Sequence, residues 1–181
     1  MAEILLSSEA FIKSVTNISD NLSGKYILSS LREAQEVHLK SILGEALLER
    51  LRNLVKEGKI DEQSNLMYKY LVNKCQYYLA YMTIVEIIYK VSYKIGNSGV
   101  VKATDENMQI ATHAEMVAQK EYYQSKADFY CMELQNFLLE NRSDFAELSE
   151  CDCHKIHSNL HSAASCGFFL GGARGKLRGG H

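Results

Sequence analysis

The chain of 181 residues contains no proline. Proline breaks helix interiors because it lacks a backbone N–H and its ring clashes with the preceding turn. Average usage of about 5% would place roughly nine prolines in a chain of this length, so their absence permits long uninterrupted helices. We expect an all-α fold, an elongated bundle of about four to five helices with a long C-terminal helix and an extended C-terminal tail.

The N-terminal third of the sequence predicts three helices. The first covers residues 8–15 and is started by the hydroxyls of Ser7 and Ser8. The second runs from Lys25 to a bend at Gly44, and the third covers residues 45–56 and is closed by Gly58. Apolar residues recur at helical spacing and predict the buried faces: Leu28, Leu31, Leu39, Ile42, Leu47, Leu51 and Leu54.

Two longer helices are indicated in the middle of the chain, separated by a hairpin-like loop over residues 95–105. The fourth helix should begin at an N-cap, Asp61, and stop near Lys94. The fifth should run from about Glu106 to Asn141. The predicted inward stripes are Met67, Leu71, Cys75, Tyr78, Met82, Val85 and Tyr89 on the fourth helix and Met108, Ala111, Val117, Tyr122, Phe129, Leu134, Phe137 and Leu138 on the fifth.

Tyrosines are crowded onto the fourth helix and must point in more than one direction. One interpretation is that several lie at the bundle surface; the other is that neighbouring subunits bury this helix on two sides, since tyrosine is enriched at interfaces. The apolar run over residues 77–89 is shorter than the roughly 20 residues of a membrane span and carries Glu86, so it predicts a buried helix and no membrane contact.

The sequence divides into a helical domain, residues 1–148, and a Gly-rich basic tail, residues 149–181. Six of the eleven glycines lie between positions 167 and 180. After Asp152 the chain contains Lys and Arg but no Asp or Glu. Such a segment cannot bury enough apolar area to fold alone, so we interpret it as a docking arm. The candidate partner-binding residues are the anchors Phe168, Phe169 and Leu170, the cations Arg174, Lys176 and Arg178, and, in the loop, Gly96, Asn97, Gly99 and Val100.

Residues of metal-ligand type gather in the tail, at Cys151, Cys153, His154, His157, His161 and Cys166. Their spacing lacks the paired C-x2-4-C and H-x3-5-H knuckles of tetrahedral zinc sites. We therefore predict no metal and no cofactor, while a zinc-stabilised helical regulatory or DNA-binding module stays open as the alternative.

Nothing in the sequence singles out a catalytic group. Nucleotide-binding and nucleophile-elbow motifs are absent, and acidic pairs such as Glu45 and Glu49 are typical of solvated helix faces. We predict that the protein is not an enzyme; a small helical enzyme would need a pocket that gathers acids or histidines from different helices. The net charge of −2 gives no overall attraction to nucleic acid. The N-terminal residues do not form a signal peptide, and the odd number of cysteines favours a reducing compartment.

Three segments carry a resemblance to a known family: AQEVHLKSILGEALLERL (34–51), GNSGVV (96–101) and FLLEN (137–141). Over residues 4–148 the chain resembles the head-to-tail connector (adaptor) proteins of tailed bacteriophages that infect Bacteroidales, of the crAss-like type. The resemblance implies a structural virion protein without catalytic activity. Residues from Ser149 onward lie outside it.

The resemblance also implies an assembly. Its subunits would form a homo-oligomeric ring, commonly of about twelve copies, beneath the portal protein at the neck of the virion, assembled in the cytoplasm of the bacterial host. DNA would pass through the lumen without specific binding, and other neck or tail proteins would be further partners. Such adaptors dock through extended termini, a role that here would fall to the tail.

Overall fold

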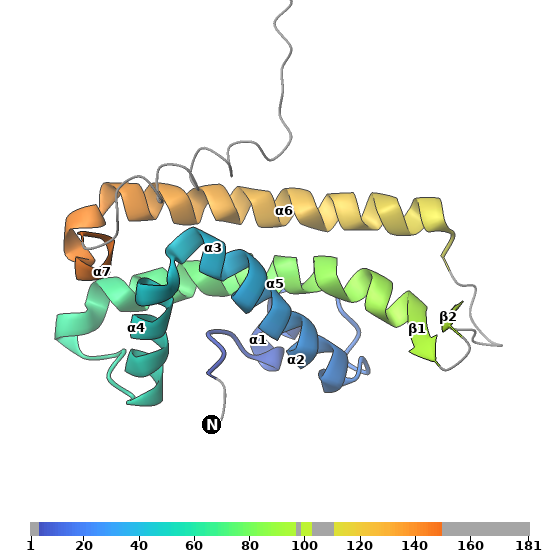
Figure 1. The fold of residues 1–181 in the computed structure, drawn as a ribbon, viewed down its shortest axis with the longest axis horizontal. Coiled ribbons are helices and arrows are strands. Elements are labelled where there is room, and N and C mark those ends of the chain that lie inside the picture. Colours follow the sequence, from blue (N-terminus) through green and yellow to red (C-terminus); the bar gives the residue numbers. More distant parts are fainter. Residues whose placement is uncertain (1–3, 97–98, 103–110, 150–181) are drawn as a thin grey trace, which may run out of the picture.

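A computed structural model describes residues 4–96, 99–102 and 111–149 of the chain. The fold is all-α, with one small β-hairpin (Figure 1). The helices are α1 (Glu9–Val15), α2 (Gly24–Glu33), the π-helical η1 (Ala34–Leu39), α3 (Lys40–Leu43), α4 (Glu45–Lys56), the 3-10 turn η2 (Gln63–Asn65), α5 (Leu66–Ser92), α6 (His113–Glu140), the 3-10 turn η3 (Arg142–Asp144) and α7 (Ala146–Ser149); the strands are β1 (Tyr93–Gly96) and β2 (Gly99–Lys102).

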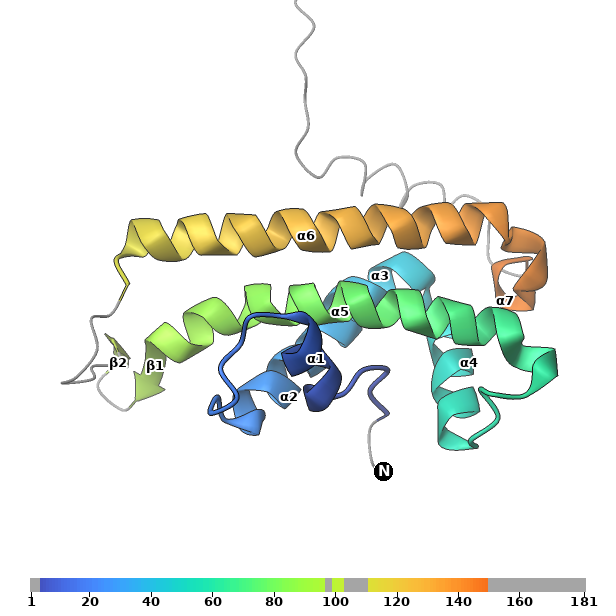
Figure 2. The same cartoon turned by 180° about the vertical axis from the view of Figure 1, so that it is seen from behind.

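Helix α5 lies at the centre of the molecule. The 28-residue helix α6 runs along one side of it, and α1, α2 and α4 lie on the opposite side (Figures 1 and 2). The hairpin β1–β2 extends one end of α5, and α7 folds back at the far end of α6. At 1.5 Å per residue α6 is about 42 Å long, which makes the bundle elongated, as expected.

The middle of α5 is buried almost all round. The predicted stripe residues Leu71, Cys75, Tyr78, Met82 and Val85 are buried, and so are several residues on the other side of the helix, including Leu79 and Thr83. A helix that is apolar on all sides needs neighbours on more than one side. Here those neighbours are α6 and the α1–α2 layer of the same chain, so the burial of α5 on two sides does not require other subunits.

The chain between α2 and α4 departs from a regular helix. The expected second helix contains a π-helical segment, η1, and ends at Gly44, whose φ of 79° and ψ of 162° are open essentially only to glycine. The predicted inward position Leu28 is 41% exposed, and Ile27 is buried in its place. The sharp bend after α3 turns α4 away from the line of α2 (Figure 1).

Two predicted helix starts are wrong. Asp61 does not cap the fourth helix: η2 intervenes, α5 begins at Leu66, and Asp61 instead forms an ion pair with Lys69 at 2.8 Å. The fifth helix begins at His113 rather than near Glu106, because Thr112 forms a capping box with Glu115. The predicted starts at Ser8 and Glu45 are confirmed.

Aromatic packing closes the α7 end of the bundle. The ring of Phe145 is fully buried and makes edge contacts with Tyr68 and Phe137. The hydroxyl of Tyr68 donates to Glu147 at 2.9 Å, and Arg50 of α4 lies 3.6 Å from the same carboxylate. Residues 145–148 therefore belong to the helical bundle.

Within the described residues, no helix combines the length and apolar character needed to cross a membrane. The tyrosine-rich segment over residues 77–89 lies inside α5 and contributes to the core.

Candidate interaction surface

The face of α6 opposite its buried positions, here called its outer face, exposes large apolar side chains. Tyr122, Phe129, Met132 and Leu139 are each between 53% and 59% exposed. With 3.6 residues per turn, Tyr122 and Phe129 lie within about 20° of each other around the helix axis, and so do Met132 and Leu139. The buried positions Met116, Ala127, Leu134 and Leu138 occupy the opposite side. The helix is thus apolar on two faces, and α5 covers one of them.

This arrangement corrects the predicted inward stripe of the fifth helix. Tyr122, Phe129 and Ala111 are exposed, and Leu134 and Leu138 are buried as expected. The apolar positions of α6 do not keep a single helical face, which is why periodicity alone chose the wrong residues.

A groove of about 250 Å³ lies between α5 and α6. It is lined by Asn73, Lys74 and Tyr77 of α5 and by Phe129, Tyr130 and Glu133 of α6. Lys74 and Glu133 face each other across it at 3.5 Å, and Lys74 also lies over the ring of Phe137. The groove joins the exposed apolar face of α6 to the exposed Tyr77 on α5.

A row of rings supports the floor of this groove. Tyr130 stacks on Tyr77 and on Tyr81, with centroids 5.4 and 5.3 Å away, and Phe129 meets the edge of Tyr130. Burial raises the pKa of the Tyr81 phenol, whose hydroxyl donates to the carbonyl of Val15. Such a stack fixes the rings at the groove and favours apolar or cationic ligands over anionic ones.

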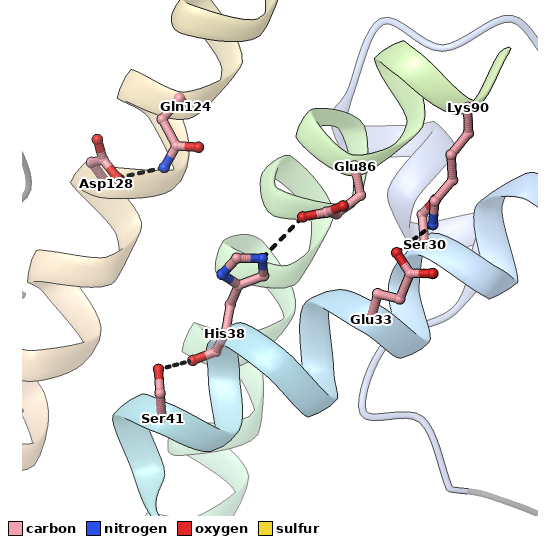
Figure 3. A network of polar contacts seen from close by, with 8 residues as sticks. All are labelled: Ser30, Glu33, His38, Ser41, Glu86, Lys90, Gln124 and Asp128. Carbon is pink, nitrogen blue, oxygen red and sulfur yellow. Dashed lines mark hydrogen bonds and ion pairs between the residues drawn. The ribbon is translucent and has the colours of Figure 1, made fainter. Parts of the chain in front are cut away.

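Polar contacts on the other side of α5 fasten it to α2 and η1 (Figure 3). His38 Nε2 lies 3.0 Å from Glu86 Oε1, and Lys90 Nζ contacts Ser30 Oγ at 3.0 Å and Glu33 at 2.5 Å. The histidine and the acid come from different helices, the arrangement that an acid–base enzyme would require. Neither residue lines the groove, so these contacts act as ties between helices.

The candidate partner-binding residues of the loop lie on the hairpin. Gly96 pairs with Gly99, and Ile95 pairs with Val100, in the antiparallel register. Asn97 lies outside the described residues, as do the tail candidates Phe168, Phe169, Leu170, Arg174, Lys176 and Arg178. Where the sequence predicted a hairpin-like loop over residues 95–105, Tyr93–Gly96 pairs with Gly99–Lys102, and residues 97–98 and 103–105 lie outside the described residues.

The part of the chain that the structure describes contains no group of three His, Cys, Asp or Glu side chains that could hold a metal ion. The cluster that includes Cys151, Cys153, His154 and His157 lies outside those residues. The thiol of Cys75 is fully buried, and burial raises its pKa, so it behaves as a core residue.

Residues 39–158 match the model of a protein family described as "Family of unknown function (DUF6712)". The chain belongs to the DUF6712 family. The matched segment of this DUF6712 protein contains α3 to α7, including the groove and the exposed face of α6, whereas α1 and α2 precede it. No curated protein and no solved structure matches the chain.

Sequence reasoning missed the groove because its residues were assigned separately to two helices. Lys74, Glu133 and Tyr130 appeared in none of the predicted sets. A signal was present, however: Tyr122 and Phe129, like Met132 and Leu139, stand seven residues apart, which marks an apolar strip on one side of a helix.

Proposed function

We propose that this DUF6712 protein is a head-to-tail connector subunit of a tailed bacteriophage, forming a homo-oligomeric ring beneath the portal protein. The observation that carries the proposal is the second apolar face of α6, with Phe129 and Met132 more than half exposed beside a groove. Exposed contiguous apolar surface marks sites of protein association. The sequence resemblance over residues 4–148 supplies the kind of assembly.

A ring closes through a head-to-tail interface that uses two different faces of each subunit. The outer face of α6 is one candidate. Exposed apolar residues on other helices, Leu28 of α2 and Val37 of η1, offer a second. An elongated bundle with both faces available suits a subunit that packs side by side around a central channel.

The charge of the protein fits a channel through which DNA slides. With 20 Lys and Arg against 22 Asp and Glu, the chain offers no excess of phosphate-binding cations. Phosphate contacts dominate non-specific DNA affinity, so a lumen made of such subunits would retain little DNA. In this proposal the protein resides at the virion neck after assembly in the bacterial cytoplasm, with portal and other neck or tail proteins as its partners.

The test is coexpression with the portal protein encoded in the same genome, followed by affinity purification of the portal and electron microscopy. Rings on the portal are expected with the full chain, and none with the Phe129→Asp/Met132→Asp variant. A chain that ends at Glu150 should keep its helical circular dichroism and lose portal binding. Absence of any portal complex with the full chain would refute the connector function.

The matched control for the ring interface is Gln119→Asp, an exposed polar position on α6 outside the apolar strip. It adds one negative charge to the same helix, as each of the two substitutions in Phe129→Asp/Met132→Asp does on its own. Rings that survive Gln119→Asp and disappear with Phe129→Asp/Met132→Asp place the interface on the apolar strip, whereas equal loss with both variants would assign the effect to charge alone.

A further inference from the structure

The C-terminal half of α6 combines acidic and apolar character. Residues 127–140 contain Asp128, Glu133 and Glu140 and no Lys or Arg. Phe129, Met132 and Leu139 are exposed among them. Glu133 keeps 49% of its side chain exposed beside Lys74 at 3.5 Å, so the pair leaves the carboxylate accessible to a second cation.

The chain itself contains a segment of the complementary composition. Residues 168–178 read FFLGGARGKLR, with three apolar residues followed by three cations and no acid. The apolar residues match the exposed rings and methyl groups of α6, and the cations match its carboxylates. Charge complementarity of this kind selects a partner and fixes its orientation.

The length of chain between the two is sufficient. Residues 150–167 separate the end of α7 from Phe168, and at about 3.3 Å per residue they could span up to roughly 60 Å. Phe129 lies eleven residues before Glu140, about 16 Å along the helix. A segment on the same chain also acts at the high effective concentration of an intramolecular ligand.

We infer that, in the free subunit, residues 168–178 dock intramolecularly on the outer face of α6, with the apolar residues at the groove beside Phe129 and the cations along Asp128, Glu133 and Glu140. The docked segment covers the apolar strip until assembly. Insofar as it rests on the connector function, the inference adds a regulatory step. The same segment leaves α6 when it binds the portal protein, so the ring interface on α6 becomes exposed only on the portal.

The test uses the full chain with the photoreactive residue p-benzoylphenylalanine in place of Phe129, an exposed position. Equal amounts of unlabelled and ¹⁵N-labelled protein are mixed at low concentration, irradiated and analysed by mass spectrometry. The expected crosslink joins the α6 peptide to residues 168–178, and both peptides carry the same isotope. Val37 carries the photoreactive residue in the control protein, where no such crosslink is expected.

Charge reversal makes the test specific. Asp128→Lys/Glu133→Lys/Glu140→Lys in the same protein should lower the crosslink yield about tenfold, since several ion pairs are replaced by repulsion. Adding Arg174→Glu/Lys176→Glu/Arg178→Glu should restore it. Circular dichroism checks that each variant stays helical.

Three results would overturn the inference: crosslinks to the helical bundle only, crosslinks between differently labelled chains, or a yield that does not respond to the paired charge reversals. The second would indicate that the segment or the face of α6 binds another copy. Because no portal protein is present, these results leave the connector function to its own test.

Discussion

The side-chain carbonyl of Gln35 accepts a hydrogen bond from the backbone N–H of Leu6 at 2.8 Å. The amide of the same side chain donates to the carbonyl of Ile4 at 2.9 Å, and Gln35 is fully buried. A single side chain of η1 thus holds the N-terminal segment against the bundle, because it bonds one backbone N–H and one backbone carbonyl of that segment. Gln76 of α5 adds a third bond, to the carbonyl of Leu6.

Replacing Gln35 with alanine should destabilise the protein by about 2–4 kcal/mol, because it leaves the buried N–H of Leu6 and the partly buried carbonyl of Ile4 without their partner. Urea unfolding followed by circular dichroism measures the change. Gln119→Ala, at an exposed position of α6, should stay within about 0.5 kcal/mol of the wild type. Equal effects of the two substitutions would show that Gln35 does not secure the N-terminal segment.

Met82→Asp should unfold the protein, since Met82 is 4% exposed in the centre of α5 and an unpaired charge there costs several kcal/mol. A typical domain is stable by only about 5–15 kcal/mol. Met132→Asp makes the same chemical change at a side chain that is 59% exposed, and it should leave the thermal unfolding midpoint almost unchanged. A folded Met82→Asp protein would mean that the side of α5 facing the core is wrongly assigned.

Gly44→Ala should cost about 1–3 kcal/mol, because the φ of 79° and ψ of 162° at Gly44 strain any residue with a Cβ. Steric clash does not contribute, since a Cβ at Gly44 would meet no atom within 4 Å. Gly58, with φ of 69°, is the matched control: Gly58→Asn should cost less than about 1 kcal/mol, because asparagine tolerates the left-handed helical conformation. Chemical denaturation of the two variants compares the costs, and a larger loss for Gly58→Asn would contradict the reasoning.

The start of α6 should give the protein a pH dependence at acidic pH. Hydrogen bonds from the backbone N–H and the hydroxyl of Thr112 hold the pKa of Glu115 below its usual value of 4.5. A folded-state pKa that is lowered contributes stability above the unfolded pKa, and this contribution is lost as the pH falls through the folded pKa.

Thermal unfolding from pH 7 to pH 3 tests this with Glu115→Gln, which keeps the hydrogen-bond acceptor and removes the charge. The wild type should unfold at a higher temperature than Glu115→Gln at pH 7, and the difference should disappear at the acidic end. Glu121→Gln, two turns further into the same helix and away from the helix end, should show a smaller difference at pH 7. A constant difference across the range would exclude the capping carboxylate as its source.

Much of the helical layout follows from local sequence. The bounds of α1 and α4, the bend at Gly44 and the inward stripe of α5 were predicted from capping residues, glycines and apolar spacing. These features depend on interactions within one or two turns. The predicted start of α5 was wrong because Asp61 forms an ion pair with Lys69 of α5 and does not cap the helix.

The candidate site was harder to predict because it forms between α5 and α6, which are joined through the hairpin. Its lining residues stand more than 50 positions apart in the chain, as Tyr77 and Tyr130 do, and only packing brings them together. The apolar residues Phe129 and Tyr122 were placed in the core because their chemistry suits a core. In the structure, Leu134 and Leu138 of α6 are the residues buried in the core, and Phe129 and Tyr122 stay exposed.

By itself the sequence determined that the protein is helical, where most helices begin and end, and that the central stripe of α5 from Leu71 to Val85 is buried, because propensity, capping and periodicity act locally. The tertiary structure decided which apolar face of α6 meets α5 and which stays exposed, and it set the π-helical turn at η1 that places Gln35 against Ile4 and Leu6. Both depend on which of several distant segments packs into the same contact, and the local sequence does not determine that choice.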